Sequence, residues 1–571
     1  MDADDEVLLA EARAWLELDP DGETRSELSA LIEAGNIAEL RDRFGAPLEF
    51  GTAGLRGIVG AGPSRMNQSV VERTTRAVAD YLLTTSGSQE APLVVVGRDA
   101  RPTSSAFADA AIGVLTEAGI AVRYFPEACP TPLVAFAARE LCTSAAIVVT
   151  ASHNPAEYNG YKLYGANAVQ IVPPVDAEIE RRIHELHVRS KATTARPTRA
   201  EPVPEELAER YLARMESERP HDAADRSLSI VYTPLHGVGG ELATRALARA
   251  GFTRVAVVAE QAAPDGSFPT ARSPNPEEPA ALALALSLAA RLEADLVLAN
   301  DPDADRLAVC VASPGGGYRT LSGNQIGLLL ADFVLERAEP TPRPLVVSTI
   351  VSSPMLADVA SHHGARFEAT LTGFKWIWSA ALALEEREHV RFAFGYEEAI
   401  GFSIGRAVRD KDGISAAVWF AELAARCALR NETVLDRLES LYRRCGLWAS
   451  AQHGVTRRGQ DGAREIAASL DVAVRTPPTS LAGRAVRGVI DFRAGATQRP
   501  PWLPSAPVVS VDLGSEGRLI LRPSGTEPKL KIYADLRRDI AASESLWVVE
   551  EALEADARAA ARELARHVGL D

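Results

Sequence analysis

Apolar positions along this chain fall into short continuous runs, separated by longer stretches with helical spacing. Continuous runs are typical of strands buried on both faces of a parallel sheet. They predict strands at residues 93–99, 145–150, 228–232, 296–299 and 345–348. Helical patterns lie around residues 242–250 and 280–292. Strands that alternate with helices predict α/β units.

The two ends of the chain have a different character. Residues up to about 45 show helical periodicity, with Leu8, Ala12, Trp15 and Leu16 on one face. Past about residue 459, Gly, Pro and Thr become frequent, and a long amphipathic helix is predicted over residues 543–567. Short strand patterns precede that helix at residues 485–491, 508–512 and 518–521. This last region is typical of a smaller α+β domain.

Two polar segments predict connections between domains. Residues 187–204 are rich in Lys, Arg, Thr and Pro, and residues 338–344 contain three prolines. At roughly 100–200 residues per domain, the length allows roughly three to five domains. We expect three related α/β units with mixed sheets and a C-terminal α+β domain, at residues 1–205, 206–338, 339–458 and 459–571.

Charge and cysteine content limit the classes of partner. The formal net charge of −16 repels nucleic acid and anionic lipid on average, so we expect neither a nucleic acid nor a membrane partner. The acidic first residues do not resemble a signal peptide, and the most apolar helical stretch is shorter than the roughly 20 residues that span a bilayer. Five cysteines without a CxxC pair favour buried free thiols in a reducing compartment. We therefore expect a cytoplasmic protein.

A candidate nucleophile follows the second predicted strand. Ser152 stands in the sequence Thr-Ala-Ser-His-Asn-Pro, at a strand end where α/β proteins place ligands. A serine flanked by Thr, His and Asn can act as a nucleophile whose oxygen the neighbours hold. An ordinary strand-end turn is the alternative. The nucleophile elbow Gly-x-Ser-x-Gly is absent, which argues against a serine hydrolase.

Three carboxylates follow another predicted strand. In an extended loop Asp301, Asp303 and Asp305 point to one side. Two carboxylates about 4 Å apart repel by about 4 kcal/mol at an effective dielectric of about 20, so the cluster favours a bound cation. Oxygen ligands suggest Mg²⁺, and a solvated acidic turn is the alternative. Arg306 stands where an EF-hand loop needs glycine, which excludes that Ca²⁺ motif.

Two further loops carry polar groups suited to a phosphorylated sugar. Glu397 and Glu398 lie between glycines and can accept hydrogen bonds from neighbouring sugar hydroxyls, although a surface turn explains this loop better when it is taken alone. The other loop combines an arginine fork, hydroxyls and backbone N–H groups, which suits a phosphate unless it is a generic loop. Its residues are Arg522, Ser524, Gly525 and Thr526.

These four loops, with residues 50–57 and 154–162, resemble the α-D-phosphohexomutase family. The resemblance extends from Phe50 to about Asp535 and is strongest for the branch of bacterial phosphoglucomutases and animal phosphopentomutase-like enzymes. It implies four domains around a central cleft. It also implies that Ser152 carries a phosphoryl group and that Asp301, Asp303 and Asp305 hold Mg²⁺, which contacts the phosphate on Ser152.

The resemblance implies roles for further residues. Arg56, His153 and Lys162 would lie beside the reacting phosphoryl group, and Arg306 would help to neutralise its charge. Some members have a histidine after the sugar-binding glutamate, where this chain has Gly401 and Phe402. The general acid/base would then be Lys162 or Lys411. Sugar hydroxyls and the second phosphate would be bound by Thr372, Gly373, Lys375, Glu397, Glu398, Arg522, Ser524, Gly525 and Thr526.

The implied reaction interconverts a sugar 1-phosphate and a sugar 6-phosphate through a bisphosphorylated intermediate. We expect glucose phosphates as substrates and glucose 1,6-bisphosphate as activator, with mannose or pentose phosphates as alternatives, in a monomer or weak homodimer. Outside the class, one alternative is a haloacid-dehalogenase-type phosphatase with Asp301 as nucleophile and Asp303 as acid/base. The usual motif of these phosphatases is Asp-x-Asp-x-Thr/Val, and counted from Asp301 its fifth position is occupied here by Asp305 instead. The other alternative outside the class is a non-catalytic protein that binds sugar phosphates.

Overall fold

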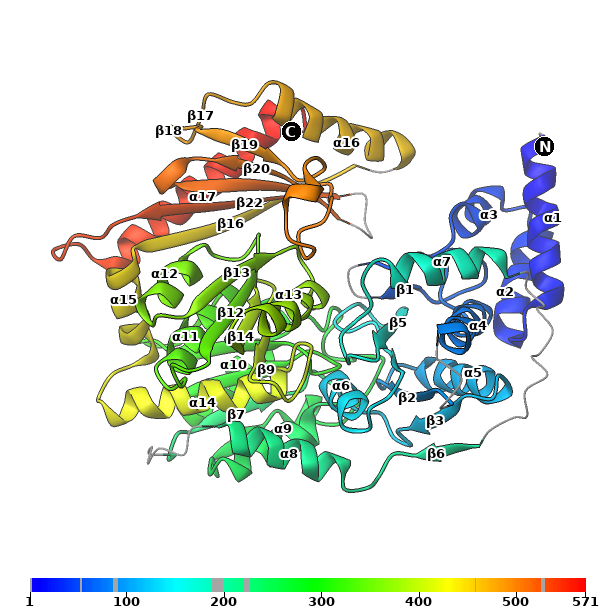
Figure 1. Cartoon of the computed structure of the whole chain (residues 1–571), viewed down its shortest axis with the longest axis horizontal. Helices are drawn as coiled ribbons and strands as arrows, with labels where there is room; N and C mark the ends of the chain where they lie inside the picture. The colour runs from blue at the N-terminus through cyan, green and yellow to red at the C-terminus, as the bar shows by residue number, and fades with distance from the viewer. Residues whose placement is uncertain are drawn as a thin grey trace. The chain divides into compact units, whose positions relative to one another are not determined.

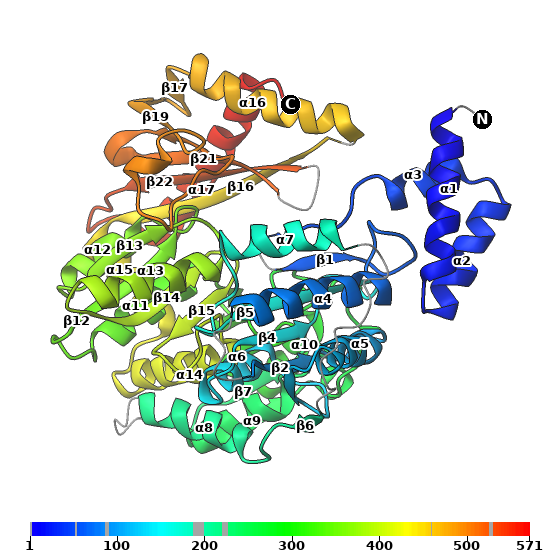
Figure 2. The ribbon, with the colours of Figure 1, turned by 45° about the vertical axis from the view of Figure 1, so that its right-hand side comes forward.

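The computed structural model of this 571-residue chain describes residues 3–51, 54–85, 91–186, 199–219, 226–457, 459–524 and 529–570 (Figures 1 and 2). The chain forms two compact units. The first contains Met1–Thr320 and Gly401–Glu422, and the second contains Leu321–Ile400 and Leu423–Asp571.

Three helices open the first unit, as the periodicity predicts. They are α1 (Ala3–Leu18), α2 (Gly22–Glu33) and α3 (Ile37–Phe44). Leu9, Ala12, Leu28 and Leu40 form their common core. Asp21 and Asn36 begin α2 and α3, and each side chain accepts a hydrogen bond from a backbone N–H of the first turn, which would otherwise lack an acceptor.

The first sheet has six strands and is mixed, as expected. Its order is β1 (Leu55–Ile58), β5 (Tyr158–Gly165), β4 (Ala145–Val149), β2 (Leu93–Arg98), β3 (Ala121–Tyr124) and β6 (Ala200–Pro202). Strands β4, β2, β3 and β6 run parallel, whereas β5 is antiparallel to both β4 and β1. Strand β6 lies in the predicted connection 187–204, so that prediction is wrong at its end; residues 187–198 lie outside the described residues.

Four helices cover this sheet. Helices α4 (Gln68–Thr85), α5 (Ser104–Glu117) and α7 (Val175–Glu185) share one apolar core with the β2 residues Val94 and Val96. Helix α6 (Thr131–Glu140) contacts β2 and β4. Every residue of β4 is buried, which is why its sequence is a continuous apolar run rather than an alternating one.

The second sheet of this unit has five strands. Its order is β11 (Tyr318–Thr320), β10 (Leu307–Ala312), β9 (Leu296–Asn300), β7 (Ile230–Thr233) and β8 (Val255–Val257). Strands β9, β7 and β8 are parallel, and β10 and β11 are antiparallel. Helices α8 (Leu207–Glu218), α9 (Gly240–Arg249) and α10 (Ala283–Leu292) belong to the same part of the chain.

The loop after β7 supports the loop that carries the three aspartates. Val238 N–H donates to Pro302 O at 2.8 Å. A Cβ at Gly237 would lie 2.4 Å from Pro302 Cα, so only glycine permits this approach. The loop that carries the three aspartates, which we call the aspartate loop, is therefore held by backbone contact with the loop after β7.

The second unit contains a parallel arrangement of β13 (Arg366–Thr370), β12 (Arg343–Thr349) and β14 (Val390–Glu397). Helices α11 (Gly323–Leu335), α12 (Met355–His362), α13 (Phe374–Arg387) and α15 (Val434–Cys445) lie in the same unit. Strand β15 (Gly401–Ile404) and the start of α14 (Gly413–Leu429) belong to the first unit.

An antiparallel sheet follows in the second unit, as predicted for an α+β domain. Its order is β16 (Leu447–Thr456), β22 (Lys529–Arg538), β21 (Gly517–Pro523), β20 (Val509–Asp512) and β19 (Gly488–Asp491). The helices are α16 (Gly459–Arg475) and α17 (Leu546–His567), and β17 (Ser480–Leu481) pairs with β18 (Arg484–Ala485). The long terminal helix is thus confirmed, beginning three residues later than expected.

The cysteine prediction is correct for four positions and wrong for one. Cys129, Cys310, Cys427 and Cys445 are buried free thiols, but Cys142 is exposed. Cys142 has a φ of +50° and lies just beyond the end of α6, where the chain turns at the surface. Across the described part of the chain, no helix is both long enough and apolar enough to cross a membrane.

Candidate active site

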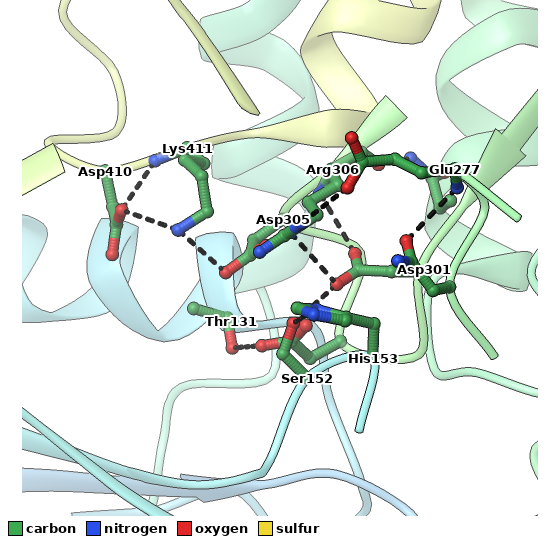
Figure 3. Close-up of polar contacts among 12 residues, drawn as sticks. Thr131, Ser152, His153, Glu277, Asp301, Asp305, Arg306, Asp410 and Lys411 are labelled. Carbon is green, nitrogen blue, oxygen red and sulfur yellow. Dashed lines mark hydrogen bonds and ion pairs between the residues drawn. The ribbon is translucent and has the colours of Figure 1, made fainter. Parts of the chain in front are cut away.

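Ser152 lies at the carboxyl end of β4 and faces the aspartate loop (Figure 3). Its Oγ donates to Asp301 Oδ2 at 2.7 Å, although the two residues are 149 positions apart in the chain. His153 Nδ1 lies 3.1 Å from the same Oγ. Ser152 is buried, and its φ of +52° is unusual for a residue with a side chain. The backbone therefore holds this hydroxyl in a specific direction.

The three aspartates form a compact buried cluster. One oxygen of each lies within 4.8 Å of the corresponding oxygens of the other two, and all three residues are buried. One oxygen of each carboxylate is already hydrogen-bonded by the protein. Asp301 Oδ1 accepts from Arg306 N–H at 3.0 Å, and Asp303 Oδ2 and Asp305 Oδ2 each accept from Lys162 Nζ at 2.7 Å.

Two of the remaining three oxygens accept no hydrogen bond from the described residues, and the third accepts one from Ser152. Asp303 Oδ1 and Asp305 Oδ1 are buried, and among the described residues neither accepts a hydrogen bond. The third, Asp301 Oδ2, accepts the hydrogen bond from Ser152 Oγ, so a cation bound there would also lie beside that hydroxyl. Buried carboxylate oxygens without donors are costly, and a divalent cation would satisfy them. A set of oxygen ligands with a neighbouring hydroxyl suits Mg²⁺, so these residues fit the predicted ion.

Four cationic side chains surround the cluster. Lys162 extends from β5, and Lys411 Nζ lies 3.1 Å from Asp305 Oδ2. Arg306 Nε lies 4.0 Å from Asp301 Oδ2 and 3.9 Å from Asp305 Oδ1. Arg56 donates to Asn154 Oδ1 at 2.8 Å, in the segment that carries Ser152, residues 150–158, which we call the serine loop. The structure therefore brings together the residues for which the family resemblance implies a place beside the phosphoryl group.

The electrostatic environment sets the protonation of these groups. Burial, followed by repulsion from Asp303 and Asp305, raises the pKa of Asp301 well above its usual range. Burial, followed by Arg306 and Arg56, lowers the pKa of His153 well below its usual range, so its imidazole is neutral at pH 7. Burial lowers the pKa of Lys162, but Asp303 and Asp305 raise it by more, so the ammonium stays charged.

Two sets of contacts at or beside the cluster involve residues to which the sequence assigned no role. Thr131, at the start of α6, donates its hydroxyl to Asp303 Oδ2 at 2.7 Å and its N–H to Asp303 O at 3.0 Å. Asp410 accepts from Tyr164 OH at 2.6 Å and from Gln170 Nε2 at 2.7 Å, which fixes the segment that carries Lys411. A threonine beside prolines indicates only a helix start, so no sequence signal marked Thr131.

The second unit contains the other predicted binding residues. Glu397 Oε1 accepts a hydrogen bond from Gly373 N–H at 2.6 Å. The segment with Thr372 and Gly373 is therefore in contact with the segment that carries Glu397. Glu398 Oε2 lies 3.3 Å from Ser352 Oγ. Lys375 Nζ lies 5.8 Å from the centre of the Trp376 ring.

The predicted phosphate loop lies only partly within the described residues. Arg522, near the end of β21, hydrogen-bonds Tyr533, and Ser524 N–H donates to Lys529 O at 2.7 Å. Gly525 and Thr526 lie outside the described residues. Their predicted role in phosphate binding therefore stays a prediction.

Four family models match successive parts of the chain. They describe the phosphoglucomutase/phosphomannomutase alpha/beta/alpha domains I, II and III and the C-terminal domain, and match residues 47–189, 209–316, 322–445 and 479–546. The chain therefore belongs to the phosphoglucomutase/phosphomannomutase family, the α-D-phosphohexomutases. Its members are isomerases that transfer a phosphoryl group within a sugar phosphate, and this assignment excludes the dehalogenase-type phosphatase hypothesis.

Individual relatives carry different substrate names. The chain is 35% identical over 552 residues to the "Probable phosphoribomutase" of Schizosaccharomyces pombe, covering 93% of this chain and 94% of the relative. It is 32% identical over 511 residues to a Staphylococcus aureus "Phosphoglucomutase", covering 87% and 91%. A solved phosphoglucomutase/phosphomannomutase family protein from Burkholderia thailandensis has the same fold, with a TM-score of 0.66, 20% identity, and coverage of 91% and 98%.

We predict that Thr131→Val weakens binding of a divalent cation by about 10-fold, because residues that orient metal ligands typically contribute this much. Valine preserves the volume but removes the hydroxyl that holds Asp303 Oδ2, so the carboxylate can rotate. Titration with Mn²⁺, followed by electron paramagnetic resonance, measures the affinity.

Thr143→Val is the matched control, because Thr143 is also buried and, within the described part of the chain, its hydroxyl donates to Ala138 O rather than to a carboxylate of the cluster. Equal Mn²⁺ affinity in the two variants would contradict the orienting role of Thr131.

Proposed function

We propose that this chain interconverts glucose 1-phosphate and glucose 6-phosphate, with Ser152 as the residue that carries the phosphoryl group between the two positions. The observation that supports this most directly is the 2.7 Å contact between Ser152 Oγ and Asp301 Oδ2. It unites the predicted nucleophile and the predicted cation ligands in one buried site. A turn or an acidic surface loop would not require this union.

The proposed transfer has two half-reactions. The 6-hydroxyl of glucose 1-phosphate attacks the phosphorus of phospho-Ser152, the bond from phosphorus to Oγ breaks, and glucose 1,6-bisphosphate forms. After the bisphosphate turns over, Ser152 Oγ attacks the phosphorus at position 1, the bond from that phosphorus to the sugar oxygen O1 breaks, and glucose 6-phosphate leaves. Each attacking hydroxyl gives its proton to a base, and each leaving oxygen takes one from an acid; Lys162 and Lys411 are the candidates for this acid/base role. The charged Lys162 ammonium suits the acid, which leaves Lys411 as the candidate base.

Catalysis in this scheme consists of positioning and neutralising charge. Asp301, Asp303 and Asp305 would hold Mg²⁺, which supplies positive charge to the oxygens of the phosphoryl group. Arg306, Arg56 and the neutral His153 lie around the same place and can donate hydrogen bonds to those oxygens. Burial of Ser152 and of all three aspartates keeps water from competing with the sugar hydroxyl.

The second unit would recognise the substrate. Glu397 and Glu398 would accept hydrogen bonds from sugar hydroxyls, together with Thr372, Gly373 and Lys375. Arg522, Ser524, Gly525 and Thr526 would bind the phosphate that is not being transferred. The bond from Gly373 N–H to Glu397 supports a joint role for these two segments. We place the domain limits at 1–205, 206–338, 339–458 and 459–571, and we propose a cytoplasmic monomer or weak homodimer.

We predict that intact mass spectrometry of enzyme treated with glucose 1,6-bisphosphate shows one added phosphate, and that Ser152→Ala abolishes it together with mutase activity. Removing Oγ leaves the phosphoryl group without an acceptor. Ser144→Ala, which alters a serine just before β4, serves as the control and should keep both properties. Normal turnover in Ser152→Ala would refute the assignment of the nucleophile.

We predict that kcat/KM is highest for glucose 1-phosphate in a panel that also contains mannose, ribose and deoxyribose 1-phosphates. The branch resemblance and the S. aureus relative favour glucose. The S. pombe relative makes ribose the specific alternative. A higher kcat/KM for ribose 1-phosphate would overturn the glucose assignment but leave the phosphoserine chemistry intact.

A further inference from the structure

A buried arginine beneath the serine loop is absent from the residues that the sequence singled out. Arg101 lies just beyond the end of β2 and is 3% exposed. A guanidinium has five N–H groups in a planar fork, and its three nitrogen atoms all donate here. Nε donates to Asp99 Oδ2 at 3.1 Å. Nη1 donates to Pro155 O at 2.6 Å and to Tyr158 O at 2.8 Å. Nη2 donates to Ser152 O at 2.7 Å and to Asn154 O at 2.5 Å.

Four carbonyl oxygens of one short segment therefore converge on a single side chain. Such oxygens repel one another and would turn apart without donors between them. The guanidinium satisfies them in a plane, and a lysine ammonium has only three donors, all on one atom. The shape of the arginine fork, as well as its charge, therefore determines the course of the serine loop.

Arg101 is itself held from the other side. Asp99 Oδ1 accepts from Arg101 N–H at 3.0 Å and from Ser104 Oγ at 2.5 Å. The Phe268 ring lies over the guanidinium, with its centre 5.0 Å from Cζ. A Cβ at Gly266 would lie 2.4 Å from Arg101 Cα, so the segment between β8 and α10 is in close contact with this residue. The guanidinium cannot shift without moving these neighbours.

These contacts act on the backbone of Ser152. Arg101 holds the carbonyl of Ser152, and Thr150 Oγ1 accepts from its N–H at 2.9 Å. Between these two fixed points the residue has a φ of +52°, a region that persists at functional sites only where the surroundings enforce it. With this backbone, Oγ points to Asp301. The donors of Arg101 are directed at Asp99 and at carbonyl oxygens.

We propose that Arg101 is a positioning residue for Ser152, the residue that carries the phosphoryl group. Arg101 holds the serine loop so that Ser152 Oγ faces the cation site. This inference rests on the proposed function of Ser152. It assigns Arg101 to the chemical step rather than to binding of the sugar phosphate or the cation. Among the described residues its guanidinium donates hydrogen bonds to Asp99 and to the serine loop, and Asp303 interacts with it only through charge. Arg101 therefore acts through the backbone of the loop.

The test compares Arg101→Lys and Arg101→Ala with Arg98→Lys. Arg98 lies three residues earlier, and its guanidinium donates to Asp99 O and Pro126 O at 3.4 Å. Among the described residues it donates no hydrogen bond to the serine loop. Because a misplacement of about 1 Å can reduce turnover by about 100-fold, we expect both Arg101 variants to lose kcat on that order. KM for the sugar phosphate and Mn²⁺ affinity should stay close to wild type, and Arg98→Lys should keep kcat.

Two further readouts separate positioning from general support of the fold. Adding methylguanidinium to Arg101→Ala should restore part of kcat, because it supplies the missing fork, whereas ammonium ion should not. Thermal unfolding, followed by circular dichroism, checks that the variants are folded. If Arg101→Ala does not fold, the kinetic comparison is made with Arg101→Lys.

The outcomes are distinguishable. A fall in kcat with unchanged KM and Mn²⁺ affinity, together with rescue by methylguanidinium, supports the proposal. The proposal is overturned if Arg101→Lys has the same kcat as Arg98→Lys. It is also overturned if Mn²⁺ affinity falls in parallel with kcat, because that pattern indicates only a structural role. Wild-type enzyme without mutase activity would instead overturn the proposed function, and with it the step that Arg101 serves.

Discussion

Three carboxylates buried within 4.8 Å of one another repel strongly, and the chain around them is arranged to offset that repulsion. Lys162 bonds two of the aspartates, and Lys411 and Arg306 lie close to the same cluster. These cations come from β5, from the segment before α14 and from the aspartate loop itself. The electrostatic balance therefore requires segments distant in sequence to meet at the three aspartates.

The backbone provides the precision that this balance needs. The carboxyl ends of β4 and β9 place Ser152 and Asp301 in contact. Gly237 lets the loop after β7 approach Pro302, while Arg101 gathers the carbonyl oxygens of the serine loop. Each device fixes a loop through main-chain groups, so the reactive side chains remain available for chemistry.

Much of this could be predicted from the sequence because the strongest signals are local. Continuous apolar runs marked β2, β4, β7, β9 and β12, and the polar loops at their ends marked Ser152 and the aspartates. Thr131 and Arg101 escaped prediction because their roles depend on carbonyl and carboxylate groups brought near only by folding. Strand β6 was missed because its three residues pair along an edge and bear no apolar run. The exposure of Cys142 follows from its turn, which composition does not reveal.

The most direct measurement is a crystal structure of the phosphorylated enzyme grown with Mn²⁺, with the ion located by its anomalous scattering. The account predicts one Mn²⁺ bound by oxygens of Asp301, Asp303 and Asp305 and by an oxygen of a phosphate on Ser152. An ion bound elsewhere, or a phosphate carried by another residue, would contradict it.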